Sequence, residues 1–197
     1  CSMTDAAEEL QQQIRSCTIC ADRLPVAPRP IVQLHSDAKL LIAGQAPGSR
    51  VHATGVPFDD PSGDRLRDWI GIDRDTFYNA SRVAIAPMGF CYPGTGKHGD
   101  RPPLKICSET WRSRVMDALP HVKLTLVIGQ YAMAWHLPDR GNNLTETVRA
   151  WRNFDESIMP LPHPSPRNNI WLSKNRWFED ELLPVLRRRC NAALYDQ

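Results

Sequence analysis

Four short apolar runs, separated by segments with helical patterning, constrain the fold of this chain more than any other feature of its sequence. We expect the runs to be strands over 39–44, 82–86, 124–129 and 157–161. Helices are predicted between them, at 60–71, 74–79, 105–119, 129–136 and 144–151. Continuous apolar strands that alternate with helices are typical of a parallel sheet covered on both faces. The sequence therefore predicts an α/β fold, a three-layer α/β/α sandwich around a short parallel sheet.

Two further helices are expected at the ends of the chain. The first covers 4–16, with Thr4 or Asp5 as its N-cap, and the last runs from about 175 to 194 with a kink at Pro184. A length of 197 residues suits one domain, which we place at 1–197. Because the first methionine is residue 3, we expect residues 1–3 to include a remnant of cloning.

The composition describes an ordinary globular protein without a strong charge signal. Hydrophobic residues make up 42%, and the net charge of +2 argues neither for nor against a nucleic-acid partner. Binding to DNA would need a local basic patch, for which the candidates are Arg50, Arg65, Arg67, Arg101, Arg167, Lys174 and Arg176. No apolar run approaches the ~20 residues that span a bilayer, and the start does not resemble a signal peptide. We therefore expect a cytoplasmic protein with no membrane contact.

Two polar loops directly follow predicted strands. The segment 44–48 (GQAPG) follows the first strand, and 163–168 (HPSPRN) follows the last. Ligands of open α/β sheets bind beyond the carboxyl ends of the strands. The first loop alone could be merely a tight strand-to-helix turn. The segment GVPF follows it at 55–58, and Ser62-Gly63 comes after that.

Four cysteines form a further pattern. Cys17 and Cys20 make a C-x2-C pair, and Cys91 and Cys107 are separated by fifteen residues. Four thiolates suit a tetrahedral zinc ion or a four-iron four-sulfur cluster. The alternative is four inert buried thiols, which the C-x2-C pair disfavours. Cys1 and Cys190 lie outside this set.

Together, the two loops and the cysteine spacing resemble the iron–sulfur group, often called family four, of the uracil-DNA glycosylase superfamily. These enzymes flip a damaged base out of DNA and cut its glycosidic bond. The resemblance implies that His163 stabilises the departing base anion and that Phe58 stacks on the flipped base. It also implies that the four cysteines hold a 4Fe-4S cluster rather than zinc. The other implied site residues contact the base (Gln45, Ala46, Pro87) or the DNA (Ser165, Arg167, Asn168).

The chain departs from the family pattern at two positions. Gln45 stands where the family has a glutamate, and Pro87 aligns with an asparagine that reads the pyrimidine edge. Because an amide cannot act as a base toward water, the water-activating group must be another residue. Asp59 and then Asp60 are the candidates, since carboxylates serve this role at glycosidic bonds. Asp60 could instead be a helix N-cap.

We therefore predict a monomeric DNA glycosylase of base excision repair, which hydrolyses the N-glycosidic bond of uracil or a related deaminated base in DNA. The alternative is an iron–sulfur protein of the same fold that binds DNA damage without hydrolysis, and a third option is an enzyme acting on small nucleosides. The segment 94–97 is either a phosphate-gripping loop or a flexible surface loop.

Overall fold

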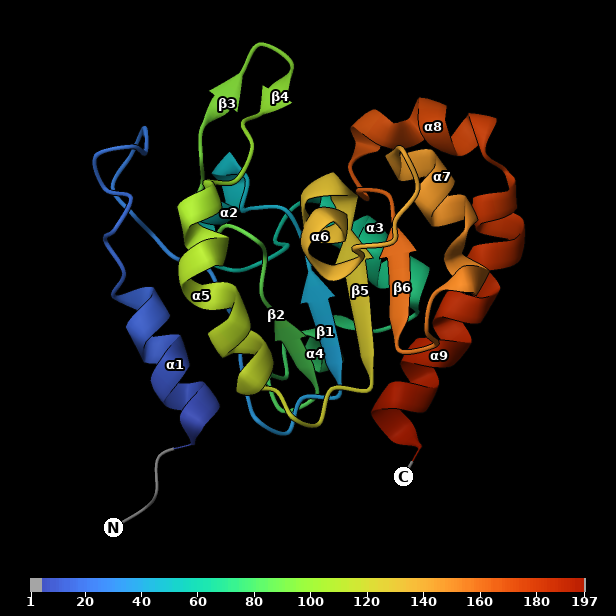
Figure 1. Ribbon diagram of the computed structural model, residues 1–197, viewed down its shortest axis with the longest axis horizontal. Coiled ribbons are helices and arrows are strands. Elements are labelled where there is room, and N and C mark those ends of the chain that lie inside the picture. Colours follow the sequence, from blue (N-terminus) through green and yellow to red (C-terminus); the bar gives the residue numbers. More distant parts are fainter. Residues whose placement is uncertain (1–4, 197) are drawn as a thin grey trace.

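A four-stranded parallel sheet lies at the centre of the computed structural model, which describes residues 5–196 (Figure 1). The strand order is β2-β1-β5-β6, and every neighbouring pair is parallel. The strands are β1 (Leu40–Ala43), β2 (Val83–Ile85), β5 (Leu124–Ile128) and β6 (Ile158–Leu161). Each lies inside one of the four predicted apolar runs, so the predicted α/β class is confirmed.

Two packed layers of helices cover the sheet. Leu40 and Ile42 belong to the larger apolar cluster, whereas Leu41 belongs to the smaller one, as expected for side chains that alternate along a strand. The smaller cluster packs against α1 (Ala6–Arg15) and α5 (Lys105–Asp117). The larger cluster includes α3 (Pro61–Ile70), α4 (Arg74–Phe77), α6 (Gly129–His136) and α9 (Leu183–Tyr195). Figure 1 shows α1 and α5 on one side of the sheet and α9 on the other, which confirms the three-layer sandwich.

The ends of the chain differ in detail from the sequence prediction. Helix α1 is capped by Asp5; the alternative cap, Thr4, and residues 1–3 lie outside the described residues. The predicted C-terminal helix, from about 175 to 194, is found as the π-helical turn η3 (Phe178–Leu182) followed without a break by α9. Helix α8 (Asn169–Lys174) precedes it and was not predicted. Pro184 stands in the first turn of α9, directly after the π-helical turn.

Several short elements complete the fold. Helix α7 (Leu144–Arg149) and the single turns η1 (Trp151–Asn153) and η2 (Pro166–Asn168) precede or follow β6. Helix α2 (Ser49–Thr54) and the hairpin of β3 (Thr95–Gly96) and β4 (Gly99–Asp100) were not predicted. Within residues 5–196, no helix has the length and apolar character needed to cross a bilayer.

The carboxyl ends of the parallel strands meet at one edge of the sheet. The first motif, 44–48, follows β1, and the second, 163–168, follows β6. The β3–β4 hairpin projects beyond the same edge (Figure 1). The fold therefore gathers both predicted loops and an unpredicted hairpin in one place.

Candidate active site

A cavity opens at the carboxyl edge of the sheet. Its volume is about 610 Å³, within the range of about 300–1,000 Å³ that is usual for ligand pockets. The residues that line it come from both predicted motifs, the 57–62 segment, the end of β2 and the β3–β4 hairpin. Of the sequence-predicted site residues, it contains Gln45, Ala46, Phe58, Asp60, Pro87, His163, Ser165, Arg167 and Asn168.

Phe58 reaches the floor of this cavity through an unusual backbone. Its φ is +57°, and it is the one non-glycine residue with a positive φ in the described part of the chain. The tip of its ring faces Gly44, where a Cβ would lie 3.6 Å from Phe58 Cζ. The ring also meets Phe77 edge to face, with 5.9 Å between centroids. Left-handed backbone at a non-glycine residue costs about 1–3 kcal/mol and gathers at functional sites.

The start of α3 holds Phe58 in this conformation. Gly63 packs so closely on the Phe58 carbonyl that a Cβ at residue 63 would overlap it. The guanidinium of Arg67 donates to the same carbonyl at 3.3 Å, and Asp60 Oδ1 accepts from the Gly63 N–H at 2.8 Å. Asp60 is thus the N-cap of α3 while also lining the cavity. Of the Ser62-Gly63 pair seen in the sequence, Gly63 is therefore needed for the backbone contact with Phe58.

His163 presents a ring N–H toward the cavity. The backbone N–H of Ser165 donates to His163 Nδ1 at 3.1 Å, so Nδ1 is an acceptor and the proton of the neutral ring is on Nε2. Burial lowers the pKa of His163, partly opposed by the negative charges of Asp60 and Asp100. At neutral pH the imidazole is therefore uncharged and available as a hydrogen-bond donor.

The second motif is internally braced. Asn168 Nδ2 donates to the His163 carbonyl at 2.6 Å, and the Arg167 N–H donates to Ser165 Oγ at 3.2 Å. Arg65 reaches across from α3 to the Ser165 carbonyl at 3.3 Å. These contacts fix the loop that carries His163 and leave the Arg167 side chain exposed.

A buried arginine, which the sequence analysis did not predict, donates hydrogen bonds to the backbone at Pro87. Arg112 is 1% exposed and donates to the Ala86 carbonyl at 2.5 Å and to the Pro87 carbonyl at 3.4 Å. Its other partner is His136 Nε2 at 2.7 Å. Burial and then the charge of Arg112 lower the pKa of His136 to about 3. Arg112 thus positions the segment at the end of β2, which forms part of the cavity wall. Its charge also helps to keep the neighbouring His136 neutral.

Asp59 does not join the residues that line the cavity. Its carboxylate faces Arg74, with 3.6 Å between Oδ1 and Nη2. The sequence ranked Asp59 before Asp60 as the assisting carboxylate, but the structure places Asp60 in the cavity and Asp59 beside an arginine on α4. Asp100 and His98, on the unpredicted hairpin, also line the cavity.

The basic residues proposed as a DNA patch separate into two kinds. Arg67 is 6% exposed and pairs with Asp64 at 2.8 Å, so it belongs to the support of Phe58 and not to a surface. Arg50, Arg101, Arg167, Lys174 and Arg176 are exposed and Arg65 is half-buried. Arg50 and Arg167 line the cavity itself.

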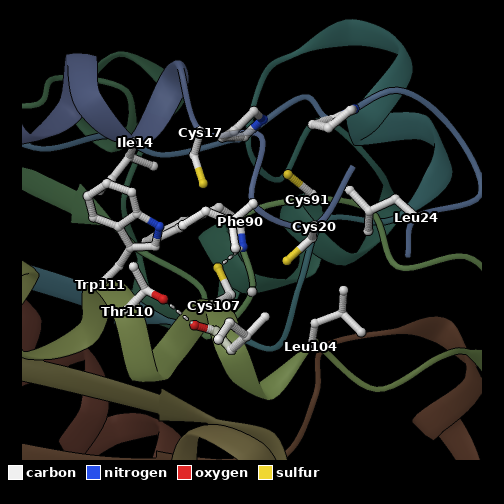
Figure 2. A pocket seen from close by; sticks show the side chains of 15 residues that line it. Ile14, Cys17, Cys20, Leu24, Phe90, Cys91, Leu104, Cys107, Thr110 and Trp111 are labelled. Carbon is white, nitrogen blue, oxygen red and sulfur yellow. Dashed lines mark hydrogen bonds between the residues drawn. The ribbon is translucent and has the colours of Figure 1, made fainter. Parts of the chain in front are cut away.

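The four predicted cysteines surround a second, small cavity. Cys17, Cys20, Cys91 and Cys107 line a space of about 30 Å³ between the loop after α1 and the start of α5. Figure 2 shows their sulfur atoms directed toward a common centre. The Phe90 N–H donates to Cys107 Sγ at 3.4 Å. Burial raises the pKa of Cys91 to about 11 and of Cys107 to about 12, so a bound cation is needed to keep these thiols ionised. Cys190 is buried elsewhere, as predicted.

Comparison with known proteins identifies the family. The profile of the uracil DNA glycosylase superfamily matches residues 32–187. A type-4 uracil-DNA glycosylase of Sulfurisphaera tokodaii is 21% identical over 176 residues, which cover 82% of this chain and 75% of that protein. The solution structure of a putative uracil DNA glycosylase from Methanosarcina acetivorans shares the fold, with a TM-score of 0.50, 19% identity, and coverage of 82% of this chain and 97% of the other. The chain therefore belongs to the uracil DNA glycosylase superfamily and is a uracil-DNA glycosylase-like hydrolase.

Proposed function

We propose that this protein is a DNA glycosylase that hydrolyses the N-glycosidic bond of uracil or a related deaminated base. The observation that carries the proposal is that His163, with its N–H on Nε2, and Phe58 line one cavity. An aromatic ring and a fixed hydrogen-bond donor are the two groups that capture of a flipped base requires.

His163 acts on the leaving base. As the bond between the sugar C1′ and the base nitrogen breaks, negative charge develops on the base and its carbonyl oxygens. A neutral imidazole that donates from Nε2 stabilises this charge without first giving up a proton. The Ser165 N–H at Nδ1 keeps the donor in place, so little reorganisation accompanies the step.

Base recognition falls mainly on Gln45. Its side-chain amide offers both a donor and an acceptor, which suits a pyrimidine edge that carries carbonyl oxygens and an N–H. Pro87 has no backbone N–H, and Arg112 engages its carbonyl. It therefore contributes shape to the wall rather than hydrogen bonds. Ala46 lines the same wall and leaves room for the base. Because the flexible Gln45 amide is the main group that recognises the base, we expect the site to accept more than one deaminated base.

Contact with DNA is assigned to the braced second motif and its surroundings. Ser165, Arg167 and Asn168 stand at the cavity edge, and Arg167 presents an exposed cation to phosphate. Arg50 adds a second cation on the opposite motif. The segment 94–97 remains a candidate phosphate contact through the exposed Lys97.

The four cysteines would hold a 4Fe-4S cluster. The C-x2-C and C-x15-C spacing of Cys17, Cys20, Cys91 and Cys107 resembles that of the iron–sulfur group of the superfamily, and a type-4 uracil-DNA glycosylase is among the relatives of the chain. A four-iron cluster binds each cysteine at a different iron, so it suits sulfurs spread around a common cavity. When bound, the cluster supplies a structural cross-link between α1, the loop after β2 and α5.

The test is cleavage of single- and double-stranded oligonucleotides that carry uracil, hypoxanthine or xanthine, followed by alkali treatment. We expect release of at least uracil, and we expect His163→Ala to slow single-turnover release by about 10²–10³-fold while DNA affinity is retained. Binding without cleavage of any substrate would support the non-hydrolytic alternative. Activity confined to free nucleosides would indicate a small-molecule enzyme.

A further inference from the structure

We infer that Asp100, on the β3–β4 hairpin, is the catalytic carboxylate that accepts the proton of the attacking water. This inference rests on the proposed glycosylase function and fills the role left open by Gln45. Among the described residues that line the active-site cavity, Asp60 and Asp100 are the two carboxylates. The choice between them depends on what else each one does.

The Asp60 carboxylate accepts a hydrogen bond from the backbone. Its Oδ1 accepts from the Gly63 N–H at 2.8 Å as the N-cap of α3. This hydrogen bond helps to hold the strained backbone at Phe58. This backbone hydrogen bond sets the orientation of the carboxylate, so we assign Asp60 mainly to building the site.

Asp100 is held by a side chain instead of by the backbone. Thr95 Oγ1 donates to Asp100 Oδ1 at 3.1 Å, and the Tyr92 hydroxyl makes a short hydrogen bond to Thr95 Oγ1. Oδ2 points toward the first motif, where a Cβ on Gly48 would lie 3.5 Å away. The paired hydroxyls hold the carboxylate at Oδ1, and Oδ2 lies toward Gly48, another residue that lines the cavity.

The hairpin also lies against the second motif. Gly99 has a φ of +117°, and a Cβ there would meet the end of the Arg167 side chain. The charges of Asp60 and then of Asp100 both act on the pKa of His163. Asp100 and His163 line the same cavity, as a water-activating group and a leaving-group donor must.

The step balances as a hydrolysis. The bond between C1′ and the base nitrogen breaks, and its electron pair leaves with the base, which His163 stabilises from Nε2. A bond forms between C1′ and the water oxygen, and the water proton passes to Asp100 Oδ2. The base then takes up a proton, which returns Asp100 to its ionised form by way of solvent.

The experiment measures single-turnover release of uracil and DNA affinity in Asp100→Asn. The amide keeps the shape and the Thr95 hydrogen bond but cannot accept the proton. We expect the rate to fall by about 10²–10⁴-fold, the usual contribution of a general base, with unchanged or tighter binding. Thr95→Val, which keeps the carboxylate, should lose less than about tenfold, and Asp75→Asn, on exposed α4 surface, should match the wild type.

The outcomes separate this inference from the proposed function. If the wild type releases uracil and Asp100→Asn does so at the same rate, Asp100 is not the base although the glycosylase function stands. If Asp60→Asn shows the large loss and Asp100→Asn does not, the roles are reversed. If the wild type releases no base from any substrate, the proposed function and this inference both fail.

Discussion

The left-handed backbone of Phe58 predicts an inverted ranking of two substitutions. At most positions glycine is less stable than alanine, by about 0.5–1 kcal/mol in a helix or strand. With a φ of +57°, alanine at residue 58 keeps the steric cost of a Cβ in the left-handed region, about 1–2 kcal/mol. Glycine removes that cost. We therefore expect Phe58→Gly to be more stable than Phe58→Ala by about 1 kcal/mol, measured by equilibrium urea unfolding.

Both variants should lose base capture equally, because both lack the ring. Stacking of a base on an aromatic side chain is worth about 1–3 kcal/mol, which corresponds to about 5- to 150-fold in affinity for a flipped base. A fluorescent base analogue opposite the uracil site measures this loss directly. If glycine is the less stable variant, the backbone reasoning is wrong. If either variant captures the base as well as the wild type, Phe58 is not the stacking residue.

Three further predictions concern the supports of the site. Gly63→Ala should destabilise the fold by about 1–3 kcal/mol in urea unfolding, because the added Cβ would overlap the Phe58 carbonyl. The variant should also release uracil more slowly. A free energy of unfolding equal to that of the wild type would contradict the contact. Cys107→Ser should abolish the iron and sulfide of anaerobically purified protein, whereas Cys190→Ala should retain both, and equal iron in the two variants would refute the ligand set. The free energy of unfolding should fall as pH drops from 6.5 toward 3, because the pKa of His136 is lowered to about 3 in the folded protein, so that only the unfolded chain takes up a proton in this window. A shallower decline in His136→Gln checks the assignment, and an identical decline would contradict it.

The sheet could be predicted because its strands are buried on both faces. Strand β5, for example, consists of Leu124–Ile128 and is buried throughout, so its sequence is an unbroken apolar run. Once four such runs alternate with helices, the parallel sheet and the position of both motifs at its carboxyl edge follow from topology. The roles expected of His163 and Phe58 came instead from the resemblance of these motifs to the uracil-DNA glycosylase superfamily.

The hairpin could not be predicted in the same way. Its strands are two residues each and are almost entirely exposed, so burial leaves no pattern in the sequence. Gly99 in the hairpin also lies close to the Arg167 side chain, a contact between segments almost seventy residues apart. Asp100 therefore looked like one more acidic residue in a loop rich in glycine and proline. Arg112 was missed for the opposite reason, since an arginine on an amphipathic helix is normally a surface residue.

The choice between Asp59 and Asp60 shows how far a local backbone feature controls the chemistry. The two residues are adjacent, and helix-capping preference correctly favoured Asp60 as a cap. What sequence preference could not supply was the left-handed turn at Phe58, because aromatic residues rarely adopt a positive φ. That turn sends the Asp59 carboxylate toward Arg74 and brings Asp60 to the start of α3 at the cavity wall. With Asp59 paired outside the cavity and Asp60 bound to the backbone at the start of α3, the cavity carboxylate that is held by a side chain alone is the one on the hairpin, Asp100.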